Sequence, residues 1–139
     1  MDTIELEIVS AEGEIFSGRA KLVVLPAKEG EIGVTPRHAP LLTLLKPGEV
    51  RVQPAEGEEQ SFYVGGGALE VQPNRITVLA DTAARAHDLD EAAALAAQQR
   101  AQDAIAGHHD KISYAEAQAE LARAVAQLKL IQKLRKVKG

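Results

Sequence analysis

The chain has 139 residues, 45% hydrophobic and 26% charged, which suits one ordinary domain or two small ones. Aromatic residues make up only 3% and tryptophan is absent, which argues against a platform that stacks nucleic-acid bases. Because the chain has no cysteine, disulfides, thiolate catalysis and cysteine-based zinc sites are excluded.

The net charge of −4 is unevenly distributed, with −7 on residues 1–90 and +5 on residues 111–139. An acidic body with a basic end favours a tail that seeks an acidic partner. The alternative is a solvent-exposed basic helix end, which the helix dipole stabilises.

The first residues are acidic, without the basic start and apolar run of a signal peptide. No apolar stretch approaches the roughly 20 residues of a membrane-spanning helix. We therefore expect a soluble, cytosolic protein that can still dock on a membrane complex.

The first part of the chain has the pattern of short strands. Ile4, Leu6 and Ile8 alternate with Glu5, Glu7 and Val9, the two-residue period of a half-buried strand. Lys46-Pro47-Gly48 is a candidate type II turn. Further strands are expected at residues 21–25, 29–34, 41–45, 50–53, 61–64, 68–71 and 75–80. Short strands with regular Gly and Pro punctuation predict an antiparallel β-sandwich or barrel.

The composition changes near residues 81–88, after which Ala and Gln dominate. Asp88 with Glu91, and Ser113 with Glu116, form candidate capping boxes that begin two helices. We expect the first helix to end near Ala106, with Gly107 as an αL stop before a bend at residues 108–111. The second helix should span about 114–136. The predicted fold is α+β with two domains, a β-sandwich at 1–86 and an antiparallel helical hairpin at 87–139.

Alanine dominates the expected contact between these helices and buries little area per residue. A hairpin held this weakly can separate without melting, although permanent docking on the sandwich is the alternative. The alanines expected at the contact are Ala92, Ala93, Ala96, Ala97, Ala101 and Ala104 in the first helix, and Ala115, Ala119, Ala122 and Ala126 in the second.

Catalytic chemistry is not evident. Residues 65–67 are three glycines without the Lys-Ser/Thr of a phosphate loop, so a turn or bulge is expected. His108, His109 and Asp110 are adjacent and cannot easily converge on one metal ion. We expect no enzyme activity, no cofactor, no metal, no nucleic-acid binding and no lipid insertion.

Seven segments in order resemble the epsilon subunit family of bacterial F-type ATP synthases over essentially the whole chain. They lie at residues 9–18, 29–33, 36–42, 46–48, 65–71, 78–83 and 89–92. The resemblance implies a non-catalytic rotor subunit, peripheral on the cytoplasmic face of the membrane. Its implied partners are the gamma subunit, the membrane c-subunit ring and the alpha/beta catalytic head. It also implies a mobile hairpin that inhibits ATP hydrolysis.

The resemblance also implies roles for particular residues. Ser10 matches the edge that faces gamma, Gly30, Glu31 and Gly33 match the loop that meets the ring, and His38 matches the loop beside that contact. The candidate cations for acidic loops of the catalytic head are Arg100, Arg123, Lys129, Lys133 and Arg135. An exposed ion pair contributes only about 0.2–1 kcal/mol, so several must act together and inhibition should be sensitive to salt.

One position departs from the family pattern. Some members bind ATP at the hairpin through a Leu/Ile-Asp-x-x-Arg-Ala motif, but here Ala93 stands at the arginine position after Asp90. Arg123 is a possible second-helix match, and Gln127 replaces a further basic residue. We predict weak or no ATP binding. The alternative to the rotor function is a free-standing β-sandwich adaptor whose hairpin binds an acidic segment of another protein.

Overall fold

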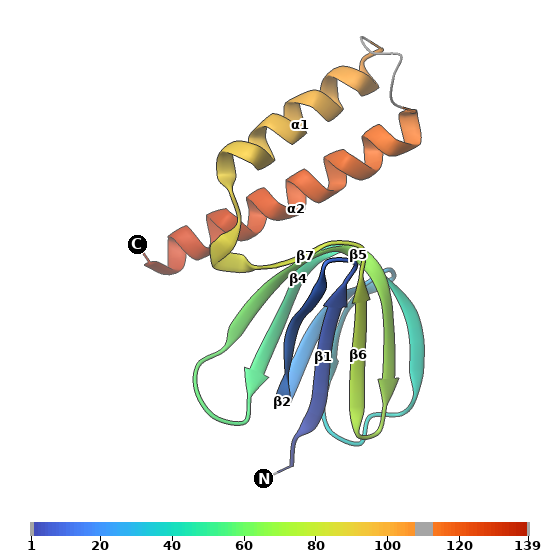
Figure 1. The fold of residues 1–139 in the computed structure, drawn as a ribbon, viewed down its shortest axis with the longest axis vertical. Helices are drawn as coiled ribbons and strands as arrows, with labels where there is room; N and C mark the ends of the chain where they lie inside the picture. The colour runs from blue at the N-terminus through green and yellow to red at the C-terminus, as the bar shows by residue number, and fades with distance from the viewer. Residues whose placement is uncertain (1, 108–112, 139) are drawn as a thin grey trace. The chain divides into compact units, whose positions relative to one another are not determined.

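The computed structural model describes residues 2–107 and 113–138 (Figure 1). The chain divides into two compact units, Met1–Arg85 and Ala86–Gly139. The first contains the β-strands and the second contains the helices. The predicted α+β fold class, a β domain followed by a helical hairpin, is confirmed.

The β domain has seven strands within its described residues. They are β1 (Ile4–Ser10), β2 (Gly13–Ala27), β3 (Gly30–Val34), β4 (Leu41–Pro54), β5 (Gln60–Gln72), β6 (Arg75–Ala80) and β7 (Ala83–Arg85). The alternation predicted for β1 is confirmed, because Ile4, Leu6 and Ile8 are fully buried. Their neighbours Glu5 and Glu7 are half-buried.

The strands pair in the order β1-β6-β5-β4-β2-β3, and β1 also pairs with β2, which closes the sheet on itself. The closed ring contains five strands, an odd number, so its neighbours cannot all be antiparallel. The parallel pair is β1 with β6, from Glu5–Arg75 to Ser10–Ala80. The purely antiparallel arrangement expected from the sequence is therefore wrong at this one pairing.

The turn expected at Lys46-Pro47-Gly48 is also wrong, because β4 continues through it and stays paired with β5 on both sides. The pairing of β4 with β2 is interrupted between Val24 and Ala27, so the missing N–H of Pro47 falls where that ladder is broken. On β5, Gly66 and Gly67 have positive φ angles of 100° and 138°. Figure 1 shows β4 and β5 arching over one end of the domain.

The hairpin consists of α1 (Glu91–Ile105) and α2 (Tyr114–Lys138), preceded by the short 3₁₀ helix η1 (Ala86–Asp88). The predicted Ser113 cap is confirmed, since its hydroxyl accepts the N–H of Glu116 at 3.1 Å. Gly107 has a φ of +86°, which is the expected αL stop. The expected bend at residues 108–111, with His108, His109 and Asp110, lies outside the described residues.

The predicted cap at Asp88 is wrong by two residues. Asp88 ends η1, and Asp90 is the N-cap of α1, its carboxylate accepting the Ala93 N–H at 3.1 Å. Both aspartates precede the same apolar pattern, and the 3₁₀ turn before the helix decides between them.

The alanine contact between the helices is present but lies on a different face from the one expected. Only Ala101 and Ala104 of the predicted alanines are buried, whereas Ala92, Ala93 and Ala96 are exposed. On α2, Ala115, Ala119 and Ala122 are likewise exposed. The buried positions are Ala94, Ala101 and Ala104 of α1, and Ala117, Ala124 and Leu130 of α2. Alanines occur on all faces of both helices, so their positions in the sequence do not predict which face packs against the other helix.

Candidate interaction surfaces

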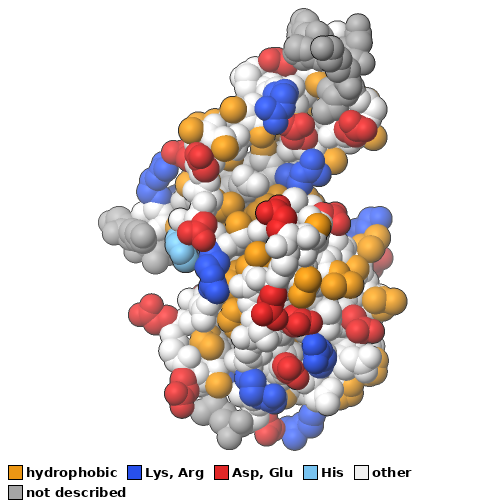
Figure 2. Space-filling model, in the orientation of Figure 1, with side chains coloured by type: hydrophobic (Ala, Val, Ile, Leu, Met, Phe, Trp, Pro, Cys, Tyr) orange, Lys and Arg blue, Asp and Glu red, His pale blue; other side chains and the backbone are white. Residues whose placement is uncertain are grey.

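The largest exposed apolar side chains of the β domain gather on one outer surface. Leu42, Leu44 and Leu79 are 76%, 54% and 56% exposed. Leu44 pairs with Ala68 of β5, and Ala68 pairs with Leu79 of β6. We call Leu42, Leu44, Ala68 and Leu79 the outer apolar face. Figure 2 shows hydrophobic side chains gathered on the right-hand side of the β domain in this view, the side on which Figure 1 draws β6.

These leucines were not predicted as interaction residues from the sequence. A signal existed, because residues 41–45, interrupted only by Thr43, and residues 78–80 carry apolar side chains at successive positions rather than at every second one. Such a run indicates a strand covered on both faces. Here one face forms the core through Leu45, Val78 and Ala80, and the other is open.

A surface depression of about 490 Å³ adjoins the outer apolar face. Its charged lining consists of Lys28, Lys46 and Asp81, and its apolar lining includes Leu44 and Leu79. Within the described part of the chain, neither lysine forms an ion pair. The depression therefore combines apolar contact with two available cations.

Ser10 ends β1 and shapes the turn into β2. Its hydroxyl accepts the Glu12 N–H at 3.2 Å and donates to the Gly13 carbonyl at 3.5 Å. Ser10 pairs with Ala80, next to the Val9–Leu79 pair, so it borders the outer apolar face.

Gly30, Glu31 and Gly33 lie on β3, which ends the strand order and pairs only with β2 among the described strands. Gly30 has a φ of +143°, a conformation that favours glycine. Glu31 is exposed and forms an ion pair with Arg51 at 3.4 Å. Gly30 and Glu31, but not Gly33, line a second depression, of about 240 Å³.

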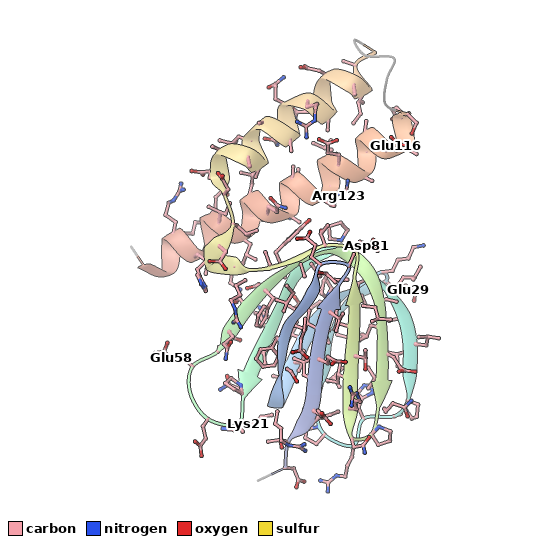
Figure 3. All side chains as sticks on the ribbon, viewed as in Figure 1. Lys21, Glu29, Glu58, Asp81, Glu116 and Arg123 are labelled. Atoms are coloured by element: carbon pink, nitrogen blue, oxygen red, sulfur yellow. The ribbon has the colours of Figure 1, made fainter. Side chains whose placement is uncertain are left out.

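Ser10 and Gly30 lie at the same end of the sheet. A row of paired residues joins them across the strands and runs Gly30, Ala27, Leu45, Gly67, Ala80 and Ser10. Figure 3 shows the labelled neighbours Glu29 and Asp81 at this end, and Lys21 at the other.

His38 does not belong to that end of the sheet. Its loop joins β3 to β4, and the neighbouring Arg37 donates its N–H to Pro73 at 2.8 Å and pairs with Asp2 at 2.7 Å. Pro73 and Asp2 lie at the end of β1 and β6 opposite Ser10. The ring of His38 contacts the Ala39 carbonyl at 2.7 Å through Nδ1.

The candidate cations of the hairpin fall into two groups. Arg100 forms an ion pair with Glu120 at 2.5 Å, and Arg135 forms one with Glu91 at 2.8 Å. The hydrogen bond to Glu91, with its opposite charge, raises the pKa of the Arg135 guanidinium above its ordinary value.

The second group faces outward on α2. Lys129 and Lys133 line a depression of about 420 Å³ together with Gln132 and Lys136, a spacing that places all four on one helix face. Arg123 lies near the middle of α2 in Figure 3, without an ion pair to any described residue.

Other candidate chemistry has a structural explanation. A Cβ on Gly67 would lie 2.2 Å from the Leu79 carbonyl oxygen, so this position requires glycine for close strand packing. Among residues 2–107 and 113–138, no group of three or more potential metal ligands occurs. None of the described helices has the length and apolarity needed to cross a bilayer.

The two units thus define a class of protein with a β-sandwich followed by a pair of long helices. Family models match both parts: "ATP synthase, Delta/Epsilon chain, beta-sandwich domain" at residues 3–86 and "ATP synthase, Delta/Epsilon chain, long alpha-helix domain" at residues 87–132. The chain belongs to the ATP synthase delta/epsilon chain family, whose members are non-catalytic stalk subunits.

Individual relatives agree. The ATP synthase epsilon chain of Nitrosococcus oceani is 61% identical over 99% of this chain and 98% of its own length. That of Alkalilimnicola ehrlichii is 60% identical over 98% of this chain and 97% of its own.

Solved structures show the same fold. A chain of the Euglena gracilis mitochondrial ATP synthase superposes with a TM-score of 0.69 at 19% identity, covering 99% of this chain and 82% of that one. A central-stalk/c-ring structure from Tetrahymena thermophila gives a TM-score of 0.63 at 14% identity, covering 94% and 97% of the two chains.

Proposed function

We propose that this chain is the epsilon-type subunit that joins the gamma subunit to the membrane ring of the ATP synthase and restrains ATP hydrolysis through its helices. The outer apolar face carries this proposal. Three leucines exposed on one surface of a β domain are typical of a site that another protein covers.

The free energies of the available contacts suggest different roles for the two domains. Fully burying a leucine side chain contributes roughly 1.5–3 kcal/mol, whereas an exposed ion pair contributes about 0.2–1 kcal/mol. The leucines of the outer apolar face therefore hold the chain on gamma. Lys129, Lys133 and the hairpin arginines make weaker, reversible contacts with acidic loops of the alpha/beta head.

Glu31 and Gly30 on the edge strand β3 contact the ring in this proposal. The edge offers an exposed carboxylate, unpaired backbone groups and little side-chain bulk, features that suit close approach to polar loops. The complex then holds the chain peripherally at the cytoplasmic face of the membrane.

Co-purification tests the proposal. A tagged full-length chain should bring down gamma together with the catalytic head. A variant ending at Ala86, with its strand content checked by circular dichroism, should retain gamma and lose the restraint on hydrolysis. If the full chain captures no gamma, and instead captures an unrelated acidic protein, the adaptor function replaces the rotor function.

A further inference from the structure

Two ion pairs connect α1 to α2 at opposite ends of the hairpin. Arg100 and Glu120 meet near the connection between the helices, at 2.5 Å. Glu91, the first residue of α1, meets Arg135 in the last turns of α2, at 2.8 Å. Each pair joins one helix to the other, so neither can survive their separation.

The contact between these two pairs is weak in apolar terms. Every buried residue of α1 is an alanine, and of the buried described residues of α2, Ala117, Ala124 and Leu130, only Leu130 is large. An alanine methyl removes far less area from water than a leucine side chain does. With Leu130 as the one large side chain buried among the described residues of the hairpin, the two ion pairs supply a measurable part of the free-energy difference between the closed hairpin and separated helices.

The other acidic residues described in α1 and α2 form no ion pair between the two helices. Asp103 accepts a hydrogen bond from Gln99 of the same helix at 3.0 Å. Glu116 lies in the first turn of α2, where the helix dipole favours a negative charge. Glu91 and Glu120 thus differ from Asp103 and Glu116 by reaching across to the other helix.

We propose that Glu91 and Glu120 compete with an acidic partner for Arg135 and Arg100. In the closed hairpin the two arginines are paired internally, and when the helices separate both become available to the partner. This inference rests on the proposed function only for the identity of the external partner. The internal competition is a property of the hairpin alone.

Competition has a particular effect on salt dependence. Salt screens the ion pairs within the hairpin and the ion pairs with the partner alike. Added salt therefore weakens both the closed hairpin and the partner-bound hairpin, and the equilibrium between them changes less with ionic strength than it would without the internal pairs. Removing the two glutamates should make inhibition stronger at low salt and steepen its decline with added salt. At about 1 M salt, where the screening length is about 3 Å, the variant and the original chain should converge.

The experiment compares Glu91→Gln/Glu120→Gln with Asp103→Asn/Glu116→Gln. Both double variants change the charge of the helices equally, but only the first removes pairs that join the helices. Since the chain has no cysteine, spin labels can be attached to the full chain at Gln102→Cys and Gln118→Cys, both exposed positions. Pulsed electron-spin distances then report the fraction of chains with separated helices.

We expect the ratio of separated to closed hairpins to rise roughly two- to thirty-fold in the first variant and to change little in the second. That range is what two surface ion pairs supply, and Arg100–Glu120, with the Glu120 side chain only 17% exposed, should contribute the larger part. The swap Glu91→Arg/Arg135→Glu should restore closure at that end. Unchanged distances in the first variant, or equal changes in both variants, would overturn the proposal. A shift in distances without any change in ATPase inhibition would support the internal competition and count against the proposed inhibitory function.

Discussion

Leu44 of β4 and Leu79 of β6 occupy positions that both pair with Ala68 of β5, and both side chains are more than half exposed. A small residue between two exposed leucines leaves a low point on an otherwise apolar surface, with Lys28 and Lys46 lining the adjoining depression. A partner helix with apolar and acidic side chains would complement this surface.

Replacing both leucines by aspartate, Leu44→Asp/Leu79→Asp, should release the chain from gamma while leaving it folded, because neither side chain belongs to the core. Loss of about 3 kcal/mol of apolar burial corresponds to a loss of affinity of roughly a hundredfold. Titration of the variants against purified gamma measures this. Leu95→Asp, at a half-exposed position of α1, is the control and should bind as the original chain does. Equal affinities for all three chains would remove the outer apolar face from the interface.

Gly67→Ala should destabilise the β domain more than Gly57→Ala, although both glycines have positive φ, of 138° and 96°. At Gly57 a Cβ would meet nothing within 4 Å, so only the backbone strain of about 1 kcal/mol is expected. At Gly67 the Cβ would lie 2.2 Å from the Leu79 carbonyl oxygen, which forces β5 and β6 apart. We expect a loss of at least about 3 kcal/mol there. Urea unfolding of the two variants compares them, and similar midpoints would show that the strands can adjust.

Asp90→Ala should destabilise α1 by about 1 kcal/mol, the usual contribution of an N-cap that accepts a backbone N–H. Asp88→Ala is the matched control, since Asp88 lies at the end of η1 with an exposed side chain paired to His87 at 3.3 Å. Thermal melts followed at a helix-sensitive wavelength should separate the two variants. A larger effect at Asp88 would mean that the helix begins where the sequence pattern alone placed it.

The same pair of aspartates shows how far the sequence could predict this structure. The N-terminal alternation at Ile4, Leu6 and Ile8, the stop at Gly107 and the cap at Ser113 each depend on local residues, and each prediction is confirmed. The choice of Asp90 over Asp88 depends on the path by which the chain leaves β7, which the local pattern does not contain.

Features that depend on distant pairing were predicted less well. Lys46-Pro47-Gly48 has the composition of a turn, but its conformation is decided by β5 alongside it and by Pro26, whose Cβ lies 2.9 Å from where a side chain on Gly48 would begin. The parallel pairing of β1 with β6 follows from closing five strands into a ring, which no single segment encodes. The candidate interaction residues could be predicted in part. Glu31 and Lys129 were chosen by resemblance. Leu44 and Leu79 are recognised only when the structure shows which face of the sheet is open to solvent.

ATP binding provides a gain-of-function test of the hairpin. Ala93 follows the capping residue Asp90 and is exposed on α1, so it offers no charged donor to a phosphate. Charge-assisted hydrogen bonds from arginine are among the strongest contacts to phosphate groups, and their absence should leave affinity too weak to detect at micromolar ATP. Ala93→Arg should introduce measurable binding, and Ala93→Arg/Gln127→Arg should strengthen it further. Isothermal titration of the three chains tests this order, with Ala96→Arg as a control for added charge at another exposed position. Micromolar binding by the unmodified chain would show that other groups already hold the phosphates.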